Sequence, residues 1–390
     1  MSATARKQAL RHYFSKFFPA HLVLRLLKPK GVCVSRRFFL NRPPNVVRNS
    51  AHVALPATAQ DLAWLFVHES NYGGQAPLLQ VNKTLLLDQP WFELHLGWLA
   101  TVASAPLAPS IQLRFVEFEL VFDIDLPDYD KRSAALPLRS GFLCYCALSE
   151  RKRCCQKCWL LLRLARVALE QHVLAPWLGE WGTPLWVFSG GKGTHCIFGS
   201  TAARTVTLLE RATLKNHLDS FASSSTDVGE KMAYWRPIMD ALLHAWEEMG
   251  IKENQILARN EAARLLGRHY LSANGPREEF EAQIAHVTDS LARWRLFVQL
   301  ATPSALLDLI WCLGLPPVDT GPLANNNGAI KAPFSVHKDT RRIALPLSPK
   351  AFATLDPETS VTVDWALPAL EEALREPVTV FKQWLDANNY

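Results

Sequence analysis

An apolar segment that ends in two carboxylates constrains this chain more than any other feature. Residues 118–125 read Phe-Glu-Leu-Val-Phe-Asp-Ile-Asp, which predicts a strand that ends with Asp123 and Asp125. Side chains two residues apart on a strand share a face. Because adjacent like charges are costly unless cations neutralise them, the pair predicts a platform for divalent metals, as in two-metal phosphoryl transfer. Taken alone, the pattern also fits a solvated turn at a strand end.

A glycine-rich turn is the second informative feature. Residues 185–199 predict a strand, a glycine turn at 190–193 and a second strand. Three glycines let the backbone approach a ligand, while Lys192 and His195 supply donors, which suits a phosphate group. The turn is not a P-loop, because a strand follows it instead of a helix. The alternative is a tight hairpin with a surface lysine and a core histidine.

Cysteines cluster shortly after the carboxylates. Of eight cysteines in the chain, five fall within fifteen residues: Cys144, Cys146, Cys154, Cys155 and Cys158. No secretory signal is recognisable before them, so the cluster favours metal binding over disulfides. The alternative is a set of free thiols in a loop.

Charge is distributed unevenly along the 390 residues. Eleven Lys or Arg and no Asp or Glu precede Asp61, which leaves 31 basic against 36 acidic residues for the remainder. A basic first segment suits phosphate binding, although a solvated face or a mitochondrial presequence has the same pattern. No uninterrupted apolar run approaches the roughly 20 residues that span a bilayer, so we expect no membrane segment.

Periodicity predicts an α/β organisation. A helix over 8–27 should break at Pro19, strands should occupy 46–48, 91–99 and 114–125, and a buried helix should cover 158–174. Residues 205–300 have helical periodicity, including 280–300. Short strands return from residue 319, followed by two helical pieces at 368–375 and 378–387. A late segment, Lys331-Ala-Pro-Phe-Ser-Val-His337, reads by itself as a loop.

Together these segments resemble the small, catalytic subunit of eukaryotic and archaeal DNA primases. The family's E-L-V-F-D-I-D motif, followed by D-Y, matches residues 119–125 and 128–129. Its S-G-x-[RK]-G-x-H-C hairpin matches residues 189–196, and the eukaryotic K-S-P-F-S-V-H matches residues 331–337. The family's third catalytic acid lies twelve residues before that lysine, where this sequence has Asp319.

The resemblance implies roles for named residues. Asp123, Asp125 and Asp319 would bind two Mg²⁺ or Mn²⁺ ions. The incoming nucleotide would be held by Arg48, Ser189, Lys192, His195, Lys331 and His337.

The family also carries a zinc site that ends in C-x-x-C-W, matched by residues 155–159. We expect one structural Zn²⁺ bound by Cys144, Cys146, Cys155 and Cys158. The upstream pair is C-x-C instead of adjacent cysteines, so Cys154 remains an alternative ligand.

The implied fold is a mixed-sheet catalytic core with a zinc knuckle and an inserted helical subdomain. We expect core residues 1–204 with the knuckle at 141–160, a helical subdomain at 205–305, and core residues 306–390. The implied activity is synthesis of short RNA primers on single-stranded DNA from ribonucleoside triphosphates. The implied partners are the primase large subunit and the replicative DNA polymerase alpha complex. The expected location is the nucleus, with the mitochondrion as the alternative.

Several positions depart from the family pattern. Arg37 replaces the acid of an R-E-F phrase, and His95 stands where K-I-D-I-G has an aspartate, which leaves nucleotide selection open. In the hairpin, Gly191 and Lys192 replace two arginines, which removes the bidentate fork that arginine offers phosphate.

Two other readings remain open at this stage. A repair-type primase-polymerase shares the hairpin histidine but prefers D-x-E over the D-x-D found here. A non-catalytic nucleic-acid-binding paralogue would have no reason to keep three carboxylates.

Overall fold

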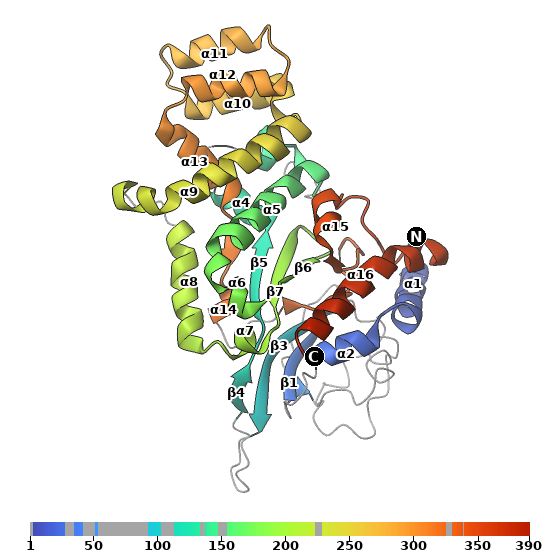
Figure 1. Ribbon diagram of the computed structural model, residues 1–390. Helices are drawn as coiled ribbons and strands as arrows, with labels where there is room; N and C mark the ends of the chain where they lie inside the picture. Colours follow the sequence, from blue (N-terminus) through green and yellow to red (C-terminus); the bar gives the residue numbers. More distant parts are fainter. Residues whose placement is uncertain are drawn as a thin grey trace.

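The protein is an α/β structure built on two five-stranded sheets (Figure 1). The computed structural model describes residues 3–27, 35–41, 51–53, 93–102, 113–132, 136, 138–146, 154–222, 228–324, 330–337 and 339–390. Every strand pair within named strands of these ranges is antiparallel, so the predicted mixture of parallel and antiparallel pairs is not found among them.

One sheet has the strand order β2-β1-β3-β4, and β9 pairs with β3. Its strands are β1 (Ser35–Asn41), β2 (Ala51–Val53), β3 (Glu93–Val102), β4 (Leu113–Glu117) and β9 (Ile330–Lys331). The strand predicted at 91–99 corresponds to β3, whereas the one predicted at 46–48 lies outside the described residues. Because β9 pairs with β3, the late segment lies beside a strand more than 200 residues earlier.

The other sheet has the order β10-β6-β7-β5-β8. Its strands are β5 (Leu120–Asp125), β6 (Leu185–Phe188), β7 (Gly193–Phe198), β8 (Val318–Asp319) and β10 (Leu345–Leu347). The predicted hairpin is confirmed, since β6 and β7 pair antiparallel on either side of the glycine turn. All residues of β6 and β7 are buried, so this hairpin is the centre of the sheet.

The strand predicted at 114–125 is wrong as one element, because β4 and β5 belong to different sheets. The break falls at Phe118 and Glu119. The buried Arg211 guanidinium donates to the carbonyls of both residues, and the Phe118 amide donates to the Arg204 carbonyl at 3.1 Å. A buried backbone group needs a partner, and here arginine replaces the strand ladder.

The two ends of the described chain pack together (Figure 1). Helices α1 (Ala3–Lys16) and α2 (Ala20–Leu27) break at Pro19 as predicted. The Tyr13 hydroxyl donates to the Phe334 carbonyl at 2.8 Å, and Arg25 forms an ion pair with Asp386 at 2.7 Å. The early helices are therefore part of the folded core.

The two helical pieces predicted at the end are one helix, α16 (Leu367–Ala387), which continues through Pro377. Proline removes one backbone donor from a helix. Here Pro377 is buried among the residues that α16 turns inward, including Leu374 and Phe381. Burial of this face outweighs the local cost of the proline.

Apart from the β6–β7 hairpin, the chain between β5 and β8 is mainly helical. Its helices are α4 (Leu126–Arg132), α5 (Gln156–Ala168), α6 (Ala175–Trp181), α7 (Thr201–Thr205), α8 (Leu208–Ala222), α9 (Val228–Trp246), α10 (Asn260–Tyr270), α11 (Pro276–Ile284), α12 (Ser290–Leu300) and α13 (Pro303–Gly314). Short helical turns occupy Leu138–Phe142, Leu169–Val173, Glu247–Glu253 and Ile256–Ala258. After β8 the remaining short helices are α14 (Gly321–Ala324) and α15 (Pro349–Thr354).

Two predictions about these helices have clear outcomes. The buried helix is confirmed, because eight of the thirteen residues of α5 are buried and a helical turn continues it to Val173. The continuous periodicity at 280–300 is divided between α11 and α12, because the Asp289 side chain accepts from the Ala292 amide at 2.7 Å and starts a new helix. Helices α10 to α12 form a layer at one end of the molecule, away from the strands (Figure 1).

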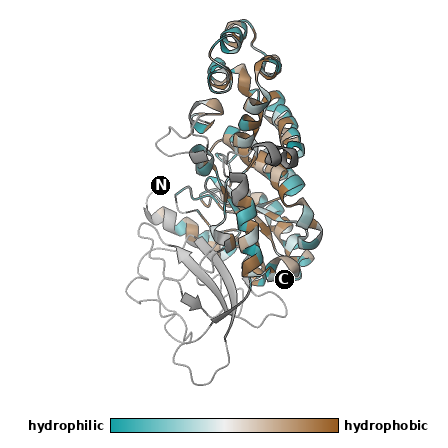
Figure 2. Ribbon diagram, turned by 90° about the vertical axis from the view of Figure 1, so that its left-hand side faces the viewer, coloured by the Kyte–Doolittle hydropathy of each residue, from teal (hydrophilic) through white to brown (hydrophobic). Residues whose placement is uncertain are grey.

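Helices α2 and α10 are clearly amphipathic. Figure 2 shows hydrophobic and hydrophilic residues interspersed along the same helices, as expected where one side is buried. Within the described ranges, none of the helices combines the length and the apolar character that a membrane span requires.

Candidate active site and metal centre

Asp123 lies at the centre of an acidic cluster. In register, it faces His195 on β7 on one side and Asp319 on β8 on the other. The His195 Nε2 atom lies 3.5 Å from Asp123 Oδ1. That oxygen is buried and has no hydrogen-bond donor among the described residues. A buried carboxylate oxygen without a donor, next to a second carboxylate, is a ligand available to a cation.

Desolvation and mutual repulsion raise the pKa of both strand-end acids, of which Asp125 is the more exposed. Desolvation, followed by the charge of Asp319, raises the pKa of Asp123 to about 7. Desolvation, followed by the charge of Asp123, raises the pKa of Asp125 to about 6, against the lowering effect of His195. Both acids therefore resist ionisation in the absence of a metal, and a bound cation would reverse this.

Backbone geometry makes room for these acids and orients them. A Cβ atom on Gly193 would lie 2.0 Å from Asp125 Oδ1, so only glycine fits opposite this carboxylate. The Gly321 amide donates to Asp319 Oδ1 at 2.8 Å. The hairpin backbone therefore leaves space for Asp125, and the backbone two residues after Asp319 orients that carboxylate.

The late segment meets the glycine hairpin. Lys331 Nζ donates to the Ser189 carbonyl at 3.2 Å, and the charge of Lys331 lowers the pKa of Asp123 against the raising effects. A Cβ atom on Gly191 would lie 2.7 Å from His337 Nε2, so the imidazole packs directly on the glycine. Lys331 and His337 thus lie beside the hairpin that carries Lys192 and His195.

Hydrogen bonds fix the shape of this hairpin. The Ser189 hydroxyl oxygen accepts from the amides of Gly191 and Gly193, both at 3.3 Å. The Lys192 carbonyl accepts from the Leu126 amide at 3.1 Å, which ties the turn to the end of β5. Gly190 has a φ of +77°, a conformation that favours glycine.

Two further positions bear on the predicted nucleotide site, Arg48 and His95. Arg48 lies outside the described residues. His95, which stands at the acid position of the family phrase, is the register partner of Lys331 between β3 and β9. His95, which replaces the acid of the family phrase, is therefore directly opposite Lys331, a residue expected to bind the nucleotide.

Four cysteine sulfurs form a separate group. The ligand atoms of Cys144, Cys146, Cys155 and Cys158 all lie within 4.8 Å of one another. The Cys155 and Cys158 sulfurs are 3.8 Å apart, which equals the spacing of about 3.8 Å for two thiolates at tetrahedral zinc, whereas the Cys144 and Cys158 sulfurs are 3.0 Å apart and would have to separate to share an ion. Cys154 is outside this group, and its sulfur donates to the Cys155 carbonyl at 3.9 Å.

The carboxylates and the cysteines differ in how tightly they gather. Among the described residues, the cysteines are the one group compact enough to surround a single ion, and the three aspartates do not form such a group.

Residues with no distinctive sequence pattern also contribute. Arg139 contacts Cys158 and Asp130, and the Thr340 hydroxyl donates to the Gly190 carbonyl at 2.5 Å. In the sequence, Arg139 is noticeable only as a lone charged residue in the mainly apolar stretch before Cys144. No sequence signal pointed to Thr340.

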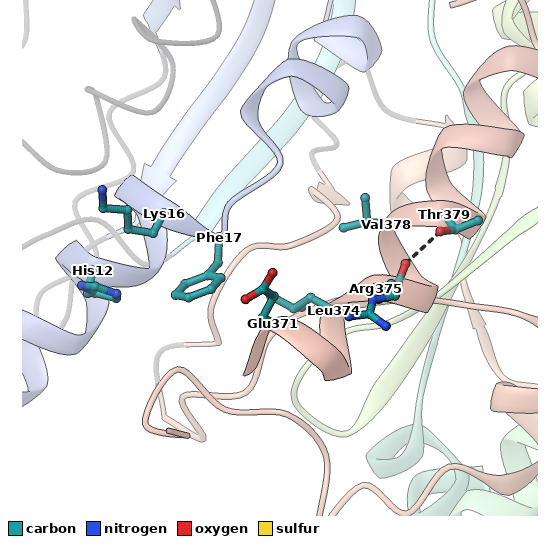
Figure 3. Close-up of a pocket in the computed structure, with 8 residues that line it drawn as sticks. All are labelled: His12, Lys16, Phe17, Glu371, Leu374, Arg375, Val378 and Thr379. Atoms are coloured by element: carbon teal, nitrogen blue, oxygen red, sulfur yellow. Dashed lines mark hydrogen bonds between the residues drawn. The ribbon is translucent and has the colours of Figure 1, made fainter. Parts of the chain in front are cut away.

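A pocket of about 610 Å³ lies between α1 and α16, away from the acidic strand (Figure 3). It is lined by His12, Lys16, Phe17, Glu371, Leu374, Arg375, Val378 and Thr379. None of the residues expected from the sequence to act in catalysis lies there.

Comparisons with known proteins agree with this arrangement. The family model described as DNA primase small subunit matches residues 122–349, more than half of the chain.

The DNA primase small subunit of Caenorhabditis elegans is 25% identical over 289 residues, which cover 67% of this chain and 67% of the relative. That of Drosophila melanogaster is 25% identical over 274 residues, covering 64% and 59%, respectively. That of Saccharomyces cerevisiae is 30% identical over 138 residues, covering 35% and 30%. The matched segments thus span less than two thirds of the fly and yeast relatives. The family match includes Asp123, Asp125 and Asp319, the hairpin and the late segment. This chain belongs to the family of DNA primase small subunits.

Proposed function

We propose that this chain synthesises short RNA primers on single-stranded DNA, by metal-dependent nucleotidyl transfer from ribonucleoside triphosphates. The observation that carries the proposal is the environment of Asp123, whose buried Oδ1 has no donor among the described residues while Asp319 is its register partner. A strand-end acid pair with a third carboxylate across the sheet is the donor set of a two-metal site.

Asp123, Asp125 and Asp319 would hold two Mg²⁺ or Mn²⁺ ions. When bound, such ions activate the attacking 3′-hydroxyl and neutralise charge on the triphosphate and the leaving pyrophosphate. The chain's own part is to fix the ligands: Gly193 leaves room for Asp125, and the Gly321 amide orients Asp319. The His195 Nε2 atom lies 3.5 Å from Asp123 Oδ1 without donating a hydrogen bond to it, so that oxygen stays available to a metal.

The incoming triphosphate would lie against the hairpin and the late segment. Its donors would be Arg48, Ser189, Lys192, His195, Lys331 and His337. The contacts of Lys331 with Ser189 and of His337 with Gly191 support one shared pocket. Lys192 supplies a point charge where an arginine would supply a fork.

The cysteine group would hold one structural Zn²⁺. Four thiolates are a typical set for a closed structural site, and the sulfur spacing supports that assignment.

Residues 205–305 would be a helical subdomain inserted into the core. The basic first sixty residues support a surface for the single-stranded template. The primase large subunit and the DNA polymerase alpha complex would be partners, in the nucleus.

A primer-synthesis assay with ribonucleotides, Mn²⁺ and single-stranded DNA tests this function directly. We expect de novo RNA products from the wild type and none from Asp125→Asn, because the variant loses a metal ligand. Asp240→Asn changes an exposed aspartate on α9 and is the matched control, with wild-type activity expected. Absence of products from the folded wild type, or normal synthesis by Asp125→Asn, would contradict the proposal.

Stability should report the repulsion around Asp123. The pKa of Asp123 is about 7 in the folded protein against about 4 for an unperturbed aspartate, so the folded state binds more protons between these values. Without added Mg²⁺ or Mn²⁺, the free energy of unfolding should fall as pH rises from about 4 to 7. We expect Asp123→Asn to be more stable than the wild type at pH 8, by on the order of 4 kcal/mol, and equal to it near pH 4. Urea unfolding at both pH values checks this, and a variant less stable at pH 8 would rule out the repulsion.

Loss of Lys331 should weaken nucleotide binding. A charged donor to a phosphate contributes roughly 1.5–3 kcal/mol, so Lys331→Ala should raise the half-saturating nucleotide concentration about ten- to a hundredfold. Template affinity should stay unchanged. Lys350→Ala, on the exposed side of α15, is the control. Equal nucleotide dependence in both variants would show that the late segment is only a structural loop.

The purified chain should contain about one zinc per molecule, measured by mass spectrometry without chelator treatment. Structural zinc supplies folding free energy on the order of 10 kcal/mol, so Cys158→Ser should lose the metal and much of its stability. Cys154→Ser and Cys312→Ser should keep the zinc, because neither sulfur belongs to the group of four. Zinc loss in Cys154→Ser would reassign the ligands.

A further inference from the structure

We infer that Arg139 is a positioning residue that stabilises the cysteine metal centre and links it to helix α4, next to the catalytic strand. The inference rests on the proposed zinc site and goes beyond it, because it assigns a role to an arginine that is not a ligand.

Arg139 is buried at the point where the two elements meet. Only 2% of its side chain is exposed. Its Nε atom donates to the Cys158 sulfur at 3.4 Å, and its NH1 atom donates to Asp130 Oδ2 at 3.0 Å. The Arg139 carbonyl accepts from the Cys144 sulfur at 3.9 Å. Both the side chain and the backbone of one residue thus contact cysteines of the group.

The charge balance explains why an arginine stands there. Four thiolates around Zn²⁺ carry a net charge of about −2 in a largely buried setting. A guanidinium hydrogen-bonded to one sulfur removes part of that excess, and residues of this kind orient the ligands and tune the metal. Asp130 in turn holds the guanidinium, so Arg139 is fixed from both sides.

The same contact connects the metal centre to the acidic strand. Helix α4 begins at Leu126, directly after Asp125, and it carries Asp130. The Tyr129 hydroxyl donates to the Leu161 carbonyl at 3.1 Å on α5, the helix that carries Cys158. Helix α4 is therefore attached to α5 twice, once through Tyr129 and once through Arg139.

Zinc affinity, measured by competition with a chromogenic chelator on the full chain, tests the inference. Removing such an outer partner typically costs 10–100-fold in metal affinity, so we expect Arg139→Met to bind zinc at least tenfold more weakly than the wild type. Arg163→Met is the matched control, because Arg163 is on the same helix as Cys158 but pairs with Glu253 at 2.7 Å. Its zinc affinity should equal that of the wild type.

Two further readouts keep the test decisive. Arg139→Lys keeps the positive charge but loses the paired N–H donors of the guanidinium, so we expect it to bind zinc about three- to tenfold more weakly than the wild type. This variant tests the inference if Arg139→Met does not fold. In the Co²⁺-loaded protein, Arg139→Met should move the thiolate-to-metal absorption to longer wavelength, because the sulfur loses a donor.

These measurements distinguish a failure of the proposed zinc site from a failure of the role inferred for Arg139. A wild type without zinc would remove the proposed metal centre itself. A zinc-containing wild type in which Arg139→Met weakens binding by less than tenfold, or no more than Arg163→Met does, would overturn the role of Arg139.

Discussion

Repulsion among carboxylates held in neighbouring strands is the constraint on which the rest of this structure depends. Asp123 and Asp319 face each other across β5 and β8, and Asp125 follows on the same strand. Like charges directly opposite in a sheet are destabilising. The fold tolerates them because β5 is anchored by a buried strand on its other side, and because Lys331 and His195 bring positive charge or donors close to the acids.

Buried guanidinium groups hold that strand in place. Arg211 donates to carbonyls at the start of β5, and burial lowers its pKa to about 10, so it stays charged at neutral pH. Arg204 forms a buried ion pair with Glu117 at 3.3 Å. The Tyr390 hydroxyl donates to Glu119 at 2.7 Å, which ties the segment after α16 to the same place. Breaking such buried pairs one partner at a time is costly, so the acidic strand has little freedom to move away from its repulsive neighbours.

Local patterns in the sequence were enough to predict the elements that carry the site. The hairpin at 185–199, the buried helix α5 and the break at Pro19 follow from glycine turns, apolar runs and proline, which act within a few residues. The strand break at Phe118 could not be predicted, because Arg211, more than 90 residues later, satisfies the carbonyls there. The helix break predicted near Pro377 also failed because of contacts distant in sequence, since the packing of α16 outweighs the local effect of the proline. The four clustered cysteines were visible as a motif, but Arg139 acquires its place only when α4 and α5 come together.

Counting Mn²⁺ ions at the acidic cluster is the most direct test of the central claim. Titration of the zinc-loaded protein with Mn²⁺, in the presence of single-stranded DNA and a non-hydrolysable ribonucleoside triphosphate, can be followed by the electron paramagnetic resonance signal of free Mn²⁺. The account predicts two bound ions per chain at pH 8, a lower affinity at pH 6 where protons compete for Asp123, and loss of binding in Asp319→Asn. No Mn²⁺ bound by the wild type, or two ions still bound after Asp319→Asn, would contradict it.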